Sequence, residues 1–224
     1  YQSHTVINGG QMKITILCTN ENHPINSWLD KWMLENSERH QINLVRKSIE
    51  LDTGDILFLI SCHERITKEI REKFRFTLVL HASPLPMGRG MSPHIWQILE
   101  GKNELTLSLL NAEDELDAGD IWTQIPIKLD GSELFDEINE KVFSAEVEAM
   151  TWAVNNINKA SPFKQHGKIS FYKKRTPEDS QLDPNKSIAE QFNLLRIADP
   201  NRYPAFFEIN GYKYKIHIER YDAE

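Results

Sequence analysis

The chain has few of the residues that stabilise very small or fibrous proteins. It contains two cysteines among 224 residues, Cys18 and Cys62, and each lies in an apolar, strand-like run. Two cysteines are too few for a disulfide framework, so we expect a reducing compartment, the cytoplasm. Ten glycines and ten prolines are too few for a disordered or collagen-like chain. The sequence therefore predicts a globular protein whose core forms without covalent cross-links.

Long hydrophobic runs and an excess of basic residues are also lacking. No run approaches the roughly 20 apolar residues of a membrane span, and no secretory signal peptide is recognisable. With 26 Lys and Arg against 33 Asp and Glu, the net charge is −7. Binding to bulk nucleic acid needs a surplus of basic residues. We therefore expect neither a membrane nor bulk nucleic acid as a partner.

The apolar pattern predicts strands that alternate with helices. Short, almost continuously apolar runs are typical of strands covered on both faces, and they occupy residues 12–19, 42–45, 55–60, 76–80, 104–110 and 121–127. Helical spacing of apolar residues covers residues 25–34, 64–74, 95–99 and a long segment that opens at Gly131-Ser132. This alternation predicts an α/β, Rossmann-like fold, a mostly parallel sheet with helices on both faces.

The character of the sequence changes after residue 160. Residues 161–183 are basic and rich in turn residues, Ser187 and Glu190 form a capping box, and Asn210-Gly211 is a hairpin signal. We expect a catalytic domain over residues 12–160. A linker with a small C-terminal appendage, a short helix and a β-hairpin, follows over residues 161–224. Residues 1–11 lack periodicity and lead into Met12, so we interpret them as additions to the native chain.

Two loops that follow predicted strands contain the candidate catalytic side chains. His81 comes directly after a buried strand, and Asp117 lies in a carboxylate-rich loop after another strand. Ligands gather at the carboxyl ends of parallel strands, so the two residues are expected to form an acid/base pair. Taken alone, each also has a purely structural interpretation, as a satisfied loop histidine and as part of a solvated acidic loop.

Three ordered motifs resemble those of one enzyme family. Residues 81–93, HASPLPMGRGMSP, resemble the HxSLLPxxRGxxP segment of folate-dependent formyltransferases, and residues 116–121, LDAGDI, resemble their LDxGDI turn. Residues 174–179, KRTPED, together with residues 203–206, YPAF, are similar to the lead-in to the C-terminal domain of that family. The resemblance extends from residue 12 to about residue 218. The family includes methionyl-tRNA formyltransferases and sugar-nucleotide N-formyltransferases.

The resemblance implies a reaction and a set of site residues. A formyl group passes from N10-formyltetrahydrofolate to an amine, and the family needs no metal. His81 then stabilises or protonates the tetrahedral oxyanion, and Asp117 orients water and handles the protons of the attacking amine. The folate lies between two loops, and the predicted folate-binding residues are Ser61, Cys62, His63, Ile66, Ala112, Glu113, Asp114, Glu115 and Leu116.

The sequence departs from the family pattern at one position. The family has Asn-x-His-x-Ser, in which the asparagine donates to the oxyanion, whereas this chain has Val79, which cannot donate. Ser61, Cys62 and His63 end the adjacent predicted strand and are candidate replacements, and His63 has the longest reach. Alternatively, His81 and main-chain N–H groups stabilise the oxyanion, or the chain binds its ligands without turnover.

The length and charge of the region after residue 160 indicate which amine accepts the formyl group. After residue 160 there are 11 Lys and Arg against 9 Asp and Glu, which we interpret as too short and too weakly basic a region for tRNA. We therefore expect an amino-sugar nucleotide, specifically a UDP-linked 4-amino-4,6-dideoxy sugar of a pseudaminic acid-like pathway. A methionyl-tRNA formyltransferase-like enzyme, a non-catalytic folate or nucleotide-sugar binding module, and a homodimer stay open. The predicted substrate-binding residues are Ser83, Pro86, Met87, Gly88, Arg89, Gly90 and Tyr203. Arg89 and Gly90 would hold the diphosphate, and Tyr203 or Phe206 would stack on the base.

Overall fold

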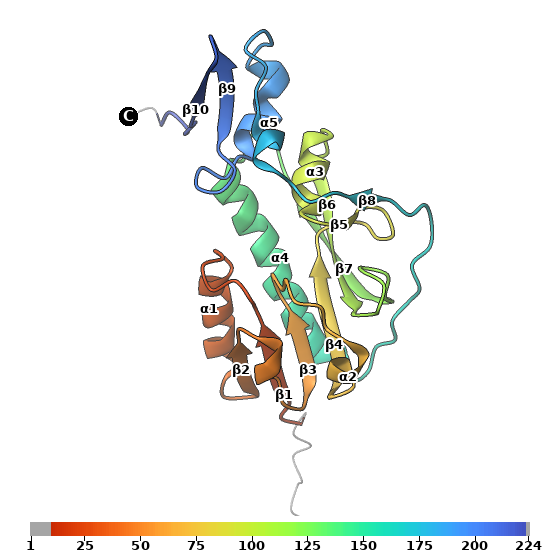
Figure 1. Ribbon diagram of the computed structural model, residues 1–224. Coiled ribbons are helices and arrows are strands. Elements are labelled where there is room, and N and C mark those ends of the chain that lie inside the picture. The colour runs from red at the N-terminus through yellow and green to blue at the C-terminus, as the bar shows by residue number, and fades with distance from the viewer. Residues whose placement is uncertain (1–9, 223–224) are drawn as a thin grey trace, which may run out of the picture. The chain divides into compact units, whose positions relative to one another are not determined.

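The computed structural model describes residues 10–222 (Figure 1). Contacts between residues divide them into two compact units that alternate along the chain. The first unit contains the residues up to Leu80 with Leu109–Thr123 and Glu146–Gln165, and the second contains His81–Ser108, Gln124–Ala145 and the residues from His166 onward. The domain boundary predicted at residue 160 stays a prediction. The interpretation of residues 1–11 as additions falls largely outside the described residues.

The main sheet has six strands in the order β2-β1-β3-β4-β6-β7. β1 (Lys13–Leu17) pairs in parallel with β2 (Gln41–Val45) and with β3 (Gly54–Leu59), and β3 pairs in parallel with β4 (Phe74–His81). β6 (Glu104–Asn111) and β7 (Ile121–Lys128) form an antiparallel pair. At its two ends the N–H of Asn111 donates to the carbonyl of Asp120, and that of Leu129 to the carbonyl of Asn103. The predicted mostly parallel α/β fold is confirmed.

Helices and the parallel strands build the core of the first unit. Besides β1, β2, β3, most of β4 and parts of β6 and β7, it contains α1 (Asn26–Asn36), a 3-10 turn η1 (Ser48–Glu50), α2 (Lys68–Arg71) and the second half of α4 (Phe135–Asn156). The Trp32 ring of α1 meets the ring of Phe58 edge-on with centroids 6.0 Å apart, and its Nε1 donates to Thr151 Oγ1 at 2.9 Å. One apolar cluster lies beside the predicted folate loop and contains Leu17, Val45, Leu51, Leu57, Ile66 and Phe74.

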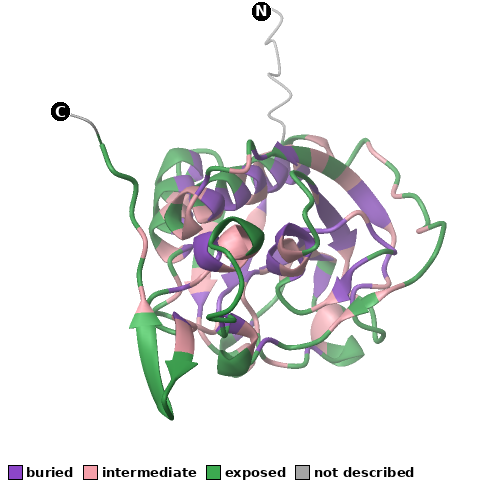
Figure 2. Ribbon diagram, turned by 90° about the horizontal axis from the view of Figure 1, so that it is seen from above, coloured by how far each residue is buried: buried purple, intermediate pink, exposed green. Residues whose placement is uncertain are grey.

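The second unit contains parts of β6 and β7 and the first half of α4, and it also contains short elements and the C-terminal hairpin. These are β5 (Arg89–Gly90), α3 (Pro93–Leu99), β8 (Phe171–Tyr172), η2 (Pro177–Ser180), η3 (Ala189–Gln191), α5 (Phe192–Arg196), β9 (Ala205–Ile209) and β10 (Tyr212–Ile216). The predicted hairpin is confirmed: Asn210 and Gly211 have φ of 55° and 81°, the left-handed values that a two-residue turn requires. The capping box is confirmed too, since Ser187 N donates to Glu190 Oε2 and Glu190 N to Ser187 Oγ. The hairpin is largely exposed (Figure 2).

Two predicted helices differ from those observed. The helix expected over residues 64–74 spans only Lys68–Arg71, because Glu64 leaves the helical path and its carboxylate accepts the N–H and the hydroxyl of Ser48. The long helix begins at Phe135 rather than at Gly131-Ser132. There the carboxylate of Glu133 accepts the N–H groups of Asp130 and Gly131 and holds a turn.

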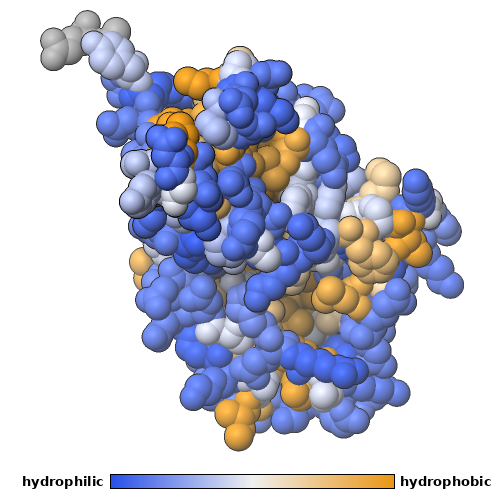
Figure 3. Space-filling view, turned by 45° about the horizontal axis from the view of Figure 1, so that its top comes forward, coloured by the Kyte–Doolittle hydropathy of each residue, from blue (hydrophilic) through white to orange (hydrophobic). Residues whose placement is uncertain are grey.

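On the face drawn in Figure 3, most of the surface is hydrophilic, and hydrophobic residues form several groups within it. Within residues 10–222, no helix combines the length and the apolar character that crossing a membrane requires.

Candidate active site

The loop after β3 is anchored by a threonine that sequence reasoning did not single out. The hydroxyl of Thr19 donates to the Ser61 carbonyl at 3.1 Å and accepts the N–H of His63 at 2.9 Å. Ser61 has a left-handed φ of 46°. The Cys62 thiol donates to the Glu64 carbonyl at 3.5 Å, and burial raises its pKa. Of the three candidate oxyanion donors, Cys62 therefore has its proton engaged, whereas the side chain of His63 is exposed.

Two predicted folate-binding side chains in this loop contribute to the core instead. Ile66 is a member of the apolar cluster of the first unit, and Cys62 packs against that cluster. Ile66 is buried, whereas Cys62 is partly exposed, and folate binding by both residues stays a prediction.

The second predicted folate loop begins beside the middle of β4. The N–H of Ala112 donates to the carbonyl of Thr77 at 2.8 Å, and Thr77 lies four residues before His81. The loop follows a strand, as expected, and that strand is β6, the antiparallel partner of β7.

Main-chain hydrogen-bonding groups are available in the second predicted folate loop. Within residues 10–222, the main-chain groups of Glu113 and Asp114 form no hydrogen bond with the rest of the protein. Arg71 Nη2 holds the Asp114 carboxylate at 2.7 Å, which lowers the pKa of Asp114. The side chains of Glu113, Asp114, Glu115 and Leu116 are exposed. The loop is therefore fixed by Arg71 while its main chain stays available to a ligand.

Asp117 is buried in a turn that a distant glutamine fixes. Its side chain and backbone are 8% exposed together, and its φ is 55°. Gln165 Nε2 donates to the carbonyls of Asp117 and Gly119, at 2.7 and 2.8 Å. A Cβ on Gly119 would lie 1.8 Å from the Asn111 carbonyl oxygen, so only glycine fits there. Sequence reasoning missed Gln165, because a single glutamine in a polar segment has no recognisable pattern.

His81, the last residue of β4, is 7% exposed. Its Nε2 lies 2.7 Å from the Gly88 carbonyl oxygen. A carbonyl oxygen only accepts, so Nε2 must have the hydrogen, which in the neutral ring leaves the lone pair on Nδ1. The structure thus assigns the neutral tautomer of this histidine from its partner.

Val79 lies two residues before His81 and points to the same side of the sheet. It is half-buried and pairs with Leu59 on β3. An apolar side chain therefore occupies the position at which the family pattern has an amide donor.

Two predicted substrate contacts, those of Arg89 and Tyr203, stay predictions, and the structure shows the surroundings of each side chain. Arg89 is only 5% exposed, and its guanidinium carbon lies 6.0 Å from the centre of the Phe171 ring, so its burial argues against direct contact with a diphosphate. One face of the Tyr203 ring is covered by the buried guanidinium of Arg175, at 5.4 Å, which weakens its prediction as a base-stacking residue.

The other predicted substrate residues are distributed between core and surface. Pro86 and Gly88 are buried, Gly90 is half-buried and Met87 is 45% exposed. Ser83 is fully buried, and within the described chain its hydroxyl has no hydrogen-bond partner.

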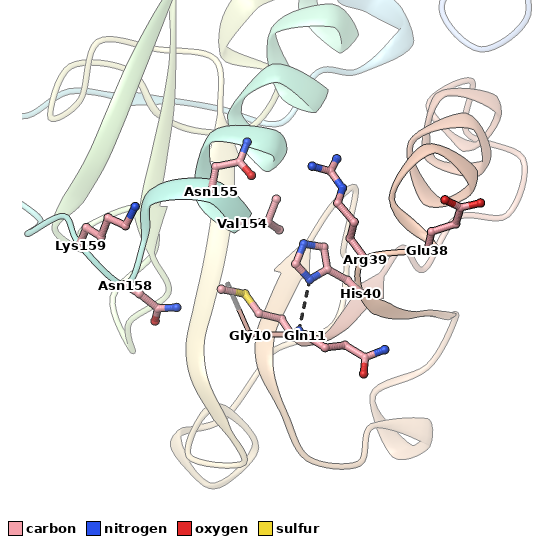
Figure 4. Close-up of a pocket in the computed structure, with 10 residues that line it drawn as sticks. Gly10, Gln11, Glu38, Arg39, His40, Val154, Asn155, Asn158 and Lys159 are labelled. Atoms are coloured by element: carbon pink, nitrogen blue, oxygen red, sulfur yellow. Dashed lines mark hydrogen bonds between the residues drawn. The ribbon is translucent and has the colours of Figure 1, made fainter. Parts of the chain in front are cut away.

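A cavity of about 610 Å3 lies elsewhere in the first unit, at the amino ends of β1 and β2 (Figure 4). Arg39 and Lys159 flank it on opposite sides, and His40 Nδ1 accepts the N–H of Met12 at 3.2 Å. None of the predicted site residues lines it, so we assign it no role in the reaction.

Comparison with known proteins places these motifs in one family. A family model described as formyl transferase matches residues 11–154. A methionyl-tRNA formyltransferase from Fusobacterium nucleatum is 27% identical over 184 residues, which are 80% of this chain and 59% of that relative. The chain therefore spans about three fifths of the length of this curated relative.

Solved structures show the same fold. A methionyl-tRNA formyltransferase from Clostridium thermocellum has a TM-score of 0.80, with 22% identity over 94% of each chain. HypX from Aquifex aeolicus, solved with tetrahydrofolic acid, has a TM-score of 0.76 and 21% identity over 93% of this chain and 38% of its own. A sugar N-formyltransferase from a Shewanella species has a TM-score of 0.70 and 13% identity over 95% of this chain and 99% of its own.

The matched residues make up well over half of the chain, and they include both loops with His81 and Asp117. The chain belongs to the formyl transferase family.

Proposed function

We propose that this protein transfers a formyl group from N10-formyltetrahydrofolate to the amine of an amino-sugar nucleotide. The supporting observation is that both motif residues are buried and fixed in place, His81 by the Gly88 carbonyl and the Asp117 turn by Gln165. Burying an ionisable side chain costs free energy, so two such residues in matching motifs indicate a chemical role.

N10-formyltetrahydrofolate supplies the activated formyl group when it is bound. The acceptor nitrogen must be neutral to attack, and we assign to Asp117 the removal of its proton. We assign to His81 the stabilisation of the negative charge that develops on the formyl oxygen, with Nδ1 as the atom that gains or gives the proton. The acceptor gains a C–N bond to the formyl carbon, the bond from that carbon to N10 breaks, and a proton ends on N10.

A second hydrogen-bond donor must compensate for Val79. Removing one oxyanion donor typically costs about 10²–10³-fold in kcat. His63 is exposed and Ser61 has a strained, left-handed backbone, so these two residues remain the candidates. If His63 donates, His63→Ala lowers kcat at least about tenfold and Val79→Asn partly restores it. If neither His63→Ala nor Ser61→Ala changes kcat, main-chain N–H groups or His81 alone serve this purpose.

The surface beside the His81 loop supports a sugar nucleotide as acceptor. In the second unit, Met87, Met91 and Phe171 are 45%, 37% and 63% exposed on or next to this loop. Apolar side chains of this kind suit the faces of a sugar ring or a base. The net charge of −7 is unfavourable for a polyanion.

The second candidate acceptor is methionyl-tRNA. It is favoured by one observation, the 27% identity to a methionyl-tRNA formyltransferase over 80% of this chain. A basic region in a longer form of the protein would be compatible with this candidate.

The deciding experiment incubates the protein with N10-formyltetrahydrofolate and a panel of acceptors. The panel contains amino-sugar nucleotides on UDP, dTDP and GDP, and initiator methionyl-tRNA, and mass spectrometry follows the addition of one formyl group. We expect formylation of an amino-sugar nucleotide and none with Asp117→Asn. Formylation of the tRNA alone would establish the second candidate. Stabilisation by folate with no formylated acceptor would establish a binding module.

A further inference from the structure

Ser170 holds the loop that carries the hydrogen-bond partner of His81. It lies directly before β8 and is half-buried. Its Oγ accepts the N–H of Gly88 at 2.8 Å, and its carbonyl accepts the N–H of Arg89 at 2.9 Å. Its own N–H donates to the Pro86 carbonyl at 3.3 Å. One residue therefore binds three consecutive peptide groups of this loop.

The peptide group between Gly88 and Arg89 is held on both sides. Its N–H donates to the Ser170 carbonyl at 2.9 Å, and its C=O accepts the Nε2 hydrogen of His81 at 2.7 Å. Hydrogen bonds in series polarise one another. The series from Ser170 through this peptide therefore makes the carbonyl a better and more precisely placed acceptor for His81.

The glycines on either side of Arg89 allow β8 to pack closely against this loop. Gly88 and Gly90 have φ of 77° and 104°. A Cβ on Gly90 would lie 2.2 Å from the Tyr172 carbonyl oxygen, and one on Gly88 would lie 2.8 Å from Tyr172 Cε2. These glycines therefore admit β8 and its neighbours against the loop, which accounts for them without a diphosphate.

We propose that Ser170 is a positioning residue for His81, which it holds in the Nε2–H tautomer by fixing the Gly88–Arg89 peptide. For catalysis the inference rests on the proposed formyl transfer, whereas the effect on the tautomer does not. With Nε2 committed to the Gly88 carbonyl, proton transfer takes place at Nδ1. Without the Ser170 hydroxyl, the Gly88 N–H loses its acceptor and the loop relaxes. The alternative tautomer of His81, with the hydrogen on Nδ1, then gains population.

The test compares Ser170→Ala with Ser170→Thr, which retains the hydroxyl, and with Ser161→Ala, the same change at an exposed serine. Long-range proton–nitrogen NMR spectra of the full chain report which ring nitrogen of His81 has the hydrogen. This readout needs neither folate nor acceptor. Steady-state kinetics with the accepted substrate and thermal unfolding complete the comparison.

We expect Ser170→Ala to shift His81 towards the Nδ1–H tautomer. We also expect it to lower kcat by about three- to tenfold with little change in KM, the effect of one ordinary hydrogen bond. Ser170→Thr restores both, and Ser161→Ala changes neither. An unchanged tautomer in Ser170→Ala, with only a lower melting temperature, would show that Ser170 is merely structural. A shifted tautomer without any formyl transfer in the wild type would refute the proposed function and leave the positioning role intact.

Discussion

The residue type at single positions of the two motif loops depends on the backbone conformation as much as on the reaction. Gly119 faces the Asn111 carbonyl at a distance that admits no side chain, and Asp117 has a left-handed φ of 55°. Such a backbone costs a residue other than glycine about 1–2 kcal/mol. Strain of this kind persists where the surroundings enforce it, often at functional sites. The LDxGD motif therefore specifies a turn that presents one aspartate in a buried position.

We expect Gly119→Ala to lower the free energy of unfolding by about 2 kcal/mol or more, because the added methyl group displaces the Asp117 turn. Gly10→Ala is the matched control, since Gly10, like Gly119, has no positive φ, but nothing lies within 4 Å of its added Cβ. The control should change the free energy of unfolding by less than about 0.5 kcal/mol. Chemical denaturation compares the two variants. Equal losses would show that the contact with Asn111 is unimportant.

Individual elements show where a sequence pattern is sufficient to predict the local structure and where it is not. Buried strands such as β3 and the Asn210-Gly211 hairpin could be predicted, because apolar runs and left-handed turn residues are local signals. The helix over residues 64–74 could not, because Glu64 binds Ser48 of another segment. Gln165 and Ser170 could not be predicted either. Each acts through a hydrogen bond to a distant loop, and neither lies in a periodic pattern.

Glu133 connects the turn before α4 to α5 within the second unit. It is 3% exposed, and its carboxylate lies 2.7 Å from Lys141 Nζ and 3.5 Å from Nη1 of Arg196, which is 1% exposed. Burial alone would raise the pKa of Glu133, but hydrogen bonds from Lys141 and the turn hold it below its ordinary value. The stability it contributes is present above the unfolded pKa, about 4.3. It is lost as the pH falls through the lower folded pKa.

We expect Glu133→Gln to lower the free energy of unfolding at pH 7 by about 3 kcal/mol, because Arg196 loses its buried counter-charge. Glu137→Gln breaks an exposed pair with Arg220 and is expected to cost less than about 1 kcal/mol. Urea denaturation from pH 3 to pH 7 measures both. A Glu133→Gln variant as stable as Glu137→Gln would contradict this account of the element.

Glu146, on α4 in the first unit, has the opposite pH dependence. Burial raises the pKa of Glu146 to about 8. The folded protein therefore keeps a proton that the unfolded chain loses above about pH 4.3. Stability from this group is fully present below that pH and is lost as the pH rises through about 8.

Glu146→Gln is expected to remove this loss of stability at high pH. Its melting temperature should exceed that of the wild type at pH 8.5 by about 2–4 °C, the equivalent of about 1 kcal/mol, and the gain should vanish towards pH 4. Glu148→Gln, an exposed position on the same helix, should follow the wild type at every pH. A difference that does not depend on pH would show that Glu146 acts through packing rather than through its charge.

At the scale of the whole chain, the negative net charge bears on which acceptor the proposed function allows. Its net charge is −7, and the face drawn in Figure 3 is mostly hydrophilic. Association with tRNA would depend on contacts to many phosphates, whereas a nucleotide sugar has two. The dependence of acceptor binding on salt therefore distinguishes the two acceptor classes.

We expect KM for the acceptor to rise by less than about tenfold between 50 and 200 mM salt. For a partner held by many phosphate contacts the affinity falls by about 10³–10⁵-fold over this range. The KM of the folate donor, measured in the same titration, serves as the control for general salt effects. A steep rise confined to the acceptor would contradict a nucleotide-sugar substrate and support tRNA.

The most direct measurement of the central claim is single-turnover formyl transfer by the wild type, His81→Ala and Asp117→Asn, with enzyme in excess over N10-formyltetrahydrofolate. The account predicts that the wild type formylates its acceptor. Each variant should bind the folate as tightly as the wild type but react about 10²–10⁴-fold more slowly, the usual contribution of an acid/base group. Wild-type rates in both variants, or folate binding by the wild type without transfer to any amine, would contradict it.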